Sequence, residues 1–432
     1  MEHSLDLTYH WAGFSALVVF VIAYAFVMAE EFTHLRKSKP VVLAAGLIWG
    51  MIAIAYSNTP HYEMVEHEIR HSFLEYTELA FFLLVAMTYI NALEERNVFN
   101  SLKSWLIKNQ FSYRQLFWIT GVLAFFLSPL ADNLTTALVL CAVVVAVGSS
   151  SPKFVGLACV NIVVAANAGG AFSPFGDITT LMVWQAGQLD FLQFFALVIP
   201  SVVNYIIPAS IMHFFVSDHK PDVAETSVTI KYGGKTIILL GLLTIVTAVS
   251  FHNFLHLPPV FGMMTGLAYL QLYSFYIKIS VKDIEEQKYD FFENVARVEW
   301  DTLLFFFGVI LSVGGLGFIG YLEYVSEFMY TDLGATTANV LVGILSAIVD
   351  NIPVMFAVLT MEPAMPDSQW LLVTLTAGVG GSMLSIGSAA GVALMGQSRG
   401  MYTFFGHLKL SLIHISEPTR RTPISYAVFC LK

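Results

Sequence analysis

Apolar runs of about 20 residues recur along the whole chain, and this feature limits its possible folds more than any other. A run of ~20 apolar residues, coiled as a helix, matches the hydrocarbon thickness of a bilayer. Only 12% of the residues are charged, about half the ~25% found in soluble domains. We therefore predict an all-α polytopic membrane protein in contact with a lipid bilayer. No basic face suited to nucleic acid is present.

The apolar segments divide into spans and folded pairs. The first segment follows Glu2 and Asp6 and has no basic region before it, so we interpret it as a membrane helix and not as a cleaved signal. Two segments are interrupted by polar centres and are predicted to be hairpins, 113–148 and 335–361. The predicted spans, of which 154–187 and 369–398 are broken helices, are 12–29, 40–57, 72–93, 154–187, 191–215, 235–251, 258–277, 301–322 and 369–398.

Lysine and arginine indicate the orientation, because cytoplasmic loops are enriched in both. Before the C-terminal tail, every basic residue except Arg70 falls on one side, provided that both hairpins enter and leave on the same side. The hairpins are therefore predicted to be re-entrant. The first opens to the cytoplasm and the second to the outside, and the N-terminus lies outside.

Three segments of the first half match three of the second in the same order. Those starting at Glu78, Ser128 and Asn167 match those starting at Asp301, Ser346 and Gly378. Inverted repeats with broken helices are typical of secondary transporters, whose site lies between the repeats. The predicted regions are 1–71 (N-terminal scaffold and external loop), 72–215 (first repeat), 216–300 (connecting helices), 301–409 (incomplete second repeat) and 410–432 (atypical tail).

Each hairpin carries an Asp-Asn pair at its polar centre, Asp132-Asn133 and Asp350-Asn351. Burial in a low dielectric favours a neutral carboxyl group, so such an aspartate can exchange a proton for a cation. The first broken helix adds Asp177, whose repeat partner is Ser388. Two alternatives stay open: these residues cap helices locally, and Glu78 and Asp301 belong either to the site or to the membrane interface.

A second motif competes with this interpretation. The sequence from His67-Glu68 to His71 has the H-E-x-x-H pattern of zinc proteases, which places two imidazoles one helical turn apart. We expect it in a polar external loop, where no third ligand is evident. A solvated loop that responds to pH through its histidines is the simpler interpretation, and no structural zinc is expected.

The strings "SPLADNLTTALVL", "NAGGAFSPFGDITTLMVWQAG" and "SAIVDNIPVMFAVL" resemble bacterial sodium/proton antiporters of the NhaD type. The resemblance covers about residues 10–409 and extends to citrate, dicarboxylate and arsenite carriers of the same superfamily. It implies a bacterial inner-membrane protein, not an enzyme, that exchanges Na+ or Li+ for H+ without a cofactor. It also implies elevator-like movement and a homodimer.

Carried over by position, the resemblance predicts one set of ion- and proton-binding residues, at which Na+ would bind. An arsenite, citrate or dicarboxylate permease is the alternative, although no lysine or arginine lies within the motif segments. The C-terminal "LSLIHISEPTRRTPISYAVFCLK" has no span to match 191–215, and we interpret 410–432 as artefactual. The predicted residues are Asp132, Asn133, Thr135, Thr136, Asn167, Ser173, Asp177, Thr179, Thr180, Asp350, Asn351, Ser382 and Ser385.

Overall fold

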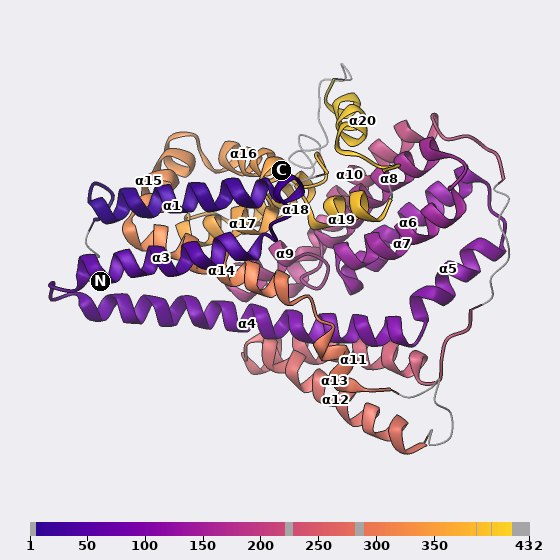
Figure 1. The fold of residues 1–432 in the computed structure, drawn as a ribbon, viewed down its shortest axis with the longest axis horizontal. Helices are drawn as coiled ribbons and strands as arrows, with labels where there is room; N and C mark the ends of the chain where they lie inside the picture. The colour runs from indigo at the N-terminus through magenta and orange to yellow at the C-terminus, as the bar shows by residue number, and fades with distance from the viewer. Residues whose placement is uncertain (1–5, 221–227, 281–288, 386, 399, 417–432) are drawn as a thin grey trace.

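The computed structural model describes residues 6–220, 228–280, 289–385, 387–398 and 400–416, and the regular elements in these ranges are all helical (Figure 1). The helices are α1 (Trp11–Met28), α2 (Glu30–Thr33), α3 (Ser38–Tyr56), α4 (Tyr62–Glu95), α5 (Val98–Lys108), α6 (Tyr113–Ala131), α7 (Asn133–Val147), α8 (Pro152–Gly170), α9 (Ile178–Gln185), η1 (Phe191–Leu197), α10 (Val198–His213), α11 (Gly234–Leu255), α12 (Pro259–Ser280), α13 (Phe291–Ala296), α14 (Trp300–Ile319), α15 (Tyr321–Ser326), η3 (Glu327–Asp332), α16 (Ala335–Ile348), α17 (Asn351–Met361), α18 (Asp367–Gly380), α19 (Ala389–Gln397) and α20 (Phe404–Ser416).

The predicted fold class is confirmed. Within the described ranges, nine helices are long and apolar enough to cross a membrane. Large apolar side chains such as Phe254 and Phe214 stand about four-fifths exposed on their outer faces. In water such exposure would be costly, whereas lipid tails solvate these side chains. The protein is therefore a multi-pass, all-α membrane protein.

The two polar centres and the two glycine-rich segments interrupt helices where the sequence predicts. Helices α6 and α7 meet at Asp132, and α16 and α17 meet at residues 349–350. Residues 171–177 separate α8 from α9, and residues 381–388 separate α18 from α19. In Figure 1, α6 and α7 lie toward one end of the long axis and α16 and α17 toward the other, with α9 and α18 between them.

The two halves repeat the same contacts between the first hairpin helix and the broken helix. The Ser128 hydroxyl donates to the Ala166 carbonyl at 2.7 Å, and the Ser346 hydroxyl donates to the Ala377 carbonyl at 2.6 Å. Ser128 and Ser346, and likewise Ala166 and Ala377, are equivalent positions in the two predicted repeats. The local geometry therefore supports an internal repeat, while the opposite orientation of its halves in the membrane stays a prediction.

Helices α1, α3 and α14, here called the N-terminal bundle, pack together at short range. A Cβ atom on Gly308 would lie 2.6 Å from the Val41 backbone, so glycine permits the close approach of α14 to α3. The Trp49 indole donates to the Leu311 carbonyl at 2.8 Å and joins the same two helices. Close packing and a buried hydrogen bond therefore join α3 and α14 tightly.

The predicted span 191–215 is confirmed as the candidate span Phe191–His213, whose first part is the 3-10 helix η1 and whose second part is α10. Two other sequence predictions need correction or lie outside the described residues. The H-E-x-x-H segment, residues 67–71, is part of the long helix α4 and not of a loop. Of the tail, residues 410–416 continue α20, and 417–432 lie outside the described part of the chain.

Gly169 and Gly380 test the close contact that each broken helix makes with the first hairpin helix of its half. A Cβ atom would lie 2.2 Å from the Phe125 carbonyl oxygen at Gly169, and 2.2 Å from the Gly343 carbonyl oxygen at Gly380. We expect Gly169→Ala and Gly380→Ala each to destabilise the protein by about 1–3 kcal/mol, because backbone cannot move aside as a side chain can. Thermal unfolding of purified protein in detergent measures this.

Gly46→Ala is the matched control, because Gly46 is also within a helix but has no atom within 4 Å of the added Cβ. It should be neutral or slightly stabilising, since alanine favours helix more than glycine does. Equal melting temperatures for Gly46→Ala and Gly169→Ala would contradict the close approach of α6 and α8.

Candidate ion-binding site

Asp177 is the buried carboxylate on which the site is built. It is 4% exposed and precedes the first turn of α9. Its Oδ1 accepts the Thr179 backbone N–H at 3.0 Å and the Thr179 hydroxyl at 2.9 Å. The helix α9 begins at a buried position, and an N-capping carboxylate that accepts hydrogen bonds from its first turn stabilises the break.

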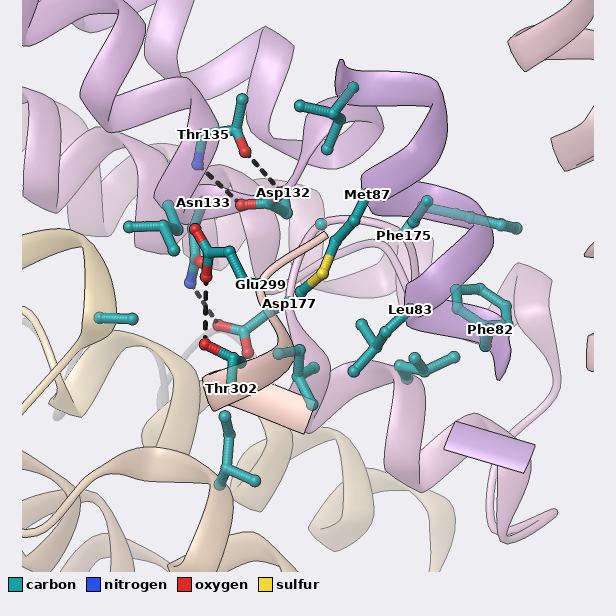
Figure 2. A pocket seen from close by; sticks show the side chains of 18 of the residues that line it. Phe82, Leu83, Met87, Asp132, Asn133, Thr135, Phe175, Asp177, Glu299 and Thr302 are labelled. Carbon is teal, nitrogen blue, oxygen red and sulfur yellow. Dashed lines mark hydrogen bonds between the residues drawn. The ribbon is translucent and has the colours of Figure 1, made fainter. Parts of the chain in front are cut away.

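Both hairpins direct an asparagine to this carboxylate (Figure 2 shows the first). The Asn133 amide donates to Asp177 Oδ2 at 3.3 Å, and the Asn351 amide lies 3.4 and 3.5 Å from the two carboxylate oxygens. Asn133 also donates to Asn167 Oδ1 at 3.0 Å, and Asn167 donates to the Ser388 hydroxyl at 3.2 Å. All four interrupted segments therefore meet in one polar network.

Asp132 caps α7 at the tip of the first hairpin. Its Oδ1 accepts the Thr135 backbone N–H at 2.8 Å, and its Oδ2 accepts the Thr135 hydroxyl at 2.9 Å. The prediction that these aspartates cap helices is therefore confirmed for Asp132 and Asp177, because each carboxylate accepts hydrogen bonds at the start of the helix that follows it. The backbone of Asp132 has a φ of 53°, which L-residues rarely adopt. Such strain costs about 1–3 kcal/mol and is concentrated at functional sites.

A cavity of about 110 Å³ opens beside these groups. Asp132, Asn133 and Asp177 line it, and Figure 2 shows Glu299 directed toward the same space from the segment before α14. The Glu299 carboxylate accepts a hydrogen bond from the Thr302 hydroxyl at 3.1 Å. No sequence pattern indicates a role for Glu299, because it lies outside every motif segment.

Asp350 occupies a different position from its repeat partner Asp132. Asn351 lines the cavity, whereas the Asp350 carboxylate pairs with Lys37, whose Nζ lies 3.2 Å from Oδ2. Lys37 itself lines the cavity. In the sequence Lys37 indicates only the orientation of the chain, and no local signal could pair residues 313 positions apart.

The remaining predicted residues with hydroxyl groups line the breaks and not the cavity. The hydroxyls of Ser173, Thr180 and Ser382 donate to the carbonyls of Pro129, Ala171 and Val379 at 2.9, 3.2 and 2.6 Å. The hydroxyls of Thr136 and Ser385 are buried without a hydrogen-bond partner among the described residues. The role of these five residues in ion binding stays a prediction.

The arrangement has the chemistry of a cation site. Asp177 and Asp132 supply carboxylate oxygens, and Thr135 and Thr179 supply hydroxyls. Asn133 and Asn351 donate hydrogen bonds to the Asp177 carboxylate, and a 180° turn of either amide presents an oxygen to a cation. Hard oxygen ligands of this kind suit small metal cations.

The H-E-x-x-H segment lies apart from this site. His67 and His71 are exposed on α4, and His71 Nδ1 lies 3.8 Å from a carboxylate oxygen of Glu75. Across the described residues, no group of three or more His, Cys, Asp or Glu side chains is arranged to hold a metal ion.

Fold and site together define a helical membrane protein of the transporter class, with broken helices around a buried carboxylate. Residues 11–378 match the citrate transporter family. The chain is 56% identical to the Na+/H+ antiporter NhaD of Vibrio cholerae and 55% identical to that of Alkalimonas amylolytica, in each case over 94% of this chain and 90% and 88% of the relative. It is 33% identical to sodium/proton antiporter 1 of Arabidopsis thaliana, over 88% of this chain and 67% of that protein.

The chain therefore belongs to the citrate transporter family, and within it to the NhaD type. The resemblance stated from the motif strings is confirmed. This places the protein among transporters and identifies it as a multi-pass membrane protein.

If a cation binds at Asp177, it should stabilise the folded protein, and this stabilisation should require the Asp177 carboxylate. Na+ or Li+ at about 100 times its Kd should stabilise the purified protein by about 2.7 kcal/mol, because only the folded state forms the site. Asp177→Asn should abolish the effect, since the amide lacks the negative charge. Asp332→Asn is the control, because Asp332 is exposed and makes no described hydrogen bond or ion pair. Stabilisation that persists in Asp177→Asn would place the cation elsewhere.

Proposed function

We propose that the protein exchanges Na+ or Li+ for H+ across the bacterial inner membrane, with Asp177 at the centre of the cation site. The observation that carries this proposal is the convergence of Asn133 and Asn351, one from each hairpin, on one buried carboxylate. The names of the two bacterial relatives reported above, Na+/H+ antiporters, support the choice of ions.

Antiport follows when proton and cation compete for the same carboxylates. A protonated Asp177 has no net charge for a cation to neutralise, and a bound cation excludes the proton. We assign Asp132 as the second titrating carboxylate, because it lines the same cavity. Lowering the pH on the cation-loading side should therefore raise the KM for Na+.

The hairpins and broken helices form the moving part in this proposal, and the N-terminal bundle belongs to the scaffold. The cavity is lined by Lys37, Asn91 and Glu299, which lie at the helix ends predicted to face the cytoplasm. We propose that this conformation opens inward, that the N-terminus lies outside, and that two copies assemble as a dimer.

A permease for citrate, dicarboxylate or arsenite is less well supported. Two basic residues, Lys37 and Arg297, do line the cavity, but each is paired with an acid. Lys37 pairs with Asp350 at 3.2 Å, and Arg297 with Glu94 at 3.2 Å. An anion would meet Asp132, Asp177 and Glu299 without free positive charge to offset the repulsion.

Exchange by inside-out vesicles tests the proposal. With a respiration-driven pH gradient, addition of Na+ or Li+ should collapse the gradient, and citrate should not. Asp132→Asn should remove proton coupling and reduce the response at least about tenfold, because the amide still bonds to Thr135 but cannot carry the proton.

Asp332→Asn, at an exposed site, should respond as the unaltered chain does. Normal exchange by Asp132→Asn would remove Asp132 from the proton pathway. If neither Na+ nor Li+ acts and citrate uptake is observed, the permease alternative holds.

A further inference from the structure

The ion pair between Lys37 and Asp350 joins parts of the protein that the proposed mechanism moves relative to each other. Lys37 directly precedes α3 of the N-terminal bundle, and Asp350 lies at the tip of the second hairpin. Their side chains are 20% and 15% exposed, so water screens the pair only slightly. Lys37 Nζ also lies 4.3 Å from the centre of the Phe305 ring on α14.

The bundle holds Lys37 in place. The next residue, Ser38, donates to Asp301 Oδ1 at the start of α14. The aromatic face of Phe305 then favours the ammonium group at the position where it meets Asp350. Two contacts, the Ser38–Asp301 hydrogen bond and the stacking of Lys37 over Phe305, therefore hold the cation at the hairpin tip from the side of the bundle.

The Asp350 carboxylate depends on the Lys37 ammonium group for charge compensation. Unlike Asp132, its side chain makes no cap bond to the helix that follows it. Its Oδ1 is buried without a hydrogen-bond partner among the described residues. A buried carboxylate with so few hydrogen bonds is costly unless a positive charge neutralises it.

We propose that Lys37 is a tethered counter-ion that replaces a mobile cation at Asp350. The pair neutralises the second hairpin and holds its tip against the N-terminal bundle. It leaves Asp177 and Asp132 as the carboxylates available to Na+ and H+. Lys37 is thus a positioning residue, and the predicted role of Asp350 changes from cation ligand to partner of Lys37. This inference rests on the proposed antiport.

If the two charges neutralise each other, removing Lys37 and removing Asp350 should change the KM for Na+ in opposite directions. Lys37→Met keeps the length of the side chain but leaves Asp350 unpaired, so the extra negative charge should lower the KM for Na+. Asp350→Asn leaves Lys37 unpaired beside the cavity, so the extra positive charge should raise that KM. Each variant should also lower the maximal rate at least about tenfold, because breaking a buried pair leaves one charge uncompensated.

The double variant Lys37→Met/Asp350→Asn distinguishes the roles. It removes both charges, so the KM should return to within about threefold of the unaltered value and the maximal rate should recover relative to both single variants. Lys37→Arg should retain most of the activity, since it keeps the charge. Lys39→Met, two residues away and exposed, should have no effect.

All variants are assayed in vesicles, with the inserted and folded amount measured by size exclusion, so that misfolding is scored separately. A double variant as inactive as Asp350→Asn would show that Asp350 binds the cation itself and would overturn the inference. So would a Lys37→Met variant with unaltered KM and rate. Failure of the unaltered chain to exchange Na+ or Li+ would instead refute the proposed antiport.

Discussion

The fold of this protein depends on hydrogen-bond partners for the backbone that leaves the helix inside the membrane. An interrupted helix has N–H and C=O groups without partners, and the hydrocarbon region supplies none. Asp177 resolves this at α9 by accepting hydrogen bonds from Thr179. Because it caps with one oxygen, its other oxygen remains for Asn133, while the Asn351 amide lies near both oxygens. The carboxylate that stabilises the helix break is therefore also the centre of the candidate cation site.

A repeated scaffold produces an asymmetric site. Ser388 occupies in the second half the position of Asp177 in the first, and both cap the helix that follows with similar backbone angles. Only Asp177 brings a charge. Similarly, Asp132 bonds to its own helix while Asp350 pairs with Lys37. Contacts that build the fold are repeated, whereas the two carboxylates proposed to bind Na+ and H+, Asp132 and Asp177, both lie in the first half.

Most of the architecture could be predicted from local sequence. Apolar runs set the spans, and Pro, Gly and Asp-Asn positions set the interruptions near Asp132, Asp177 and Asp350. The H-E-x-x-H segment was wrongly expected in a loop, because its polar residues hide the fact that α4 extends beyond the apolar region. Predicted hydroxyls such as Ser173 and Ser382 bond to backbone at the breaks. A motif gives residue types near a site but not the direction of each side chain.

The sequence by itself determined the class of protein, the positions of the breaks and the presence of three aspartates at these breaks, because hydrophobic length and helix-breaking residues act locally. The tertiary structure decided how those aspartates differ. It brought Asn133 and Asn351 to Asp177, Glu299 to the mouth of the cavity, and Lys37 to Asp350. These partners come from distant parts of the chain, and a short-range electrostatic contact depends on distance in space, which local sequence does not encode.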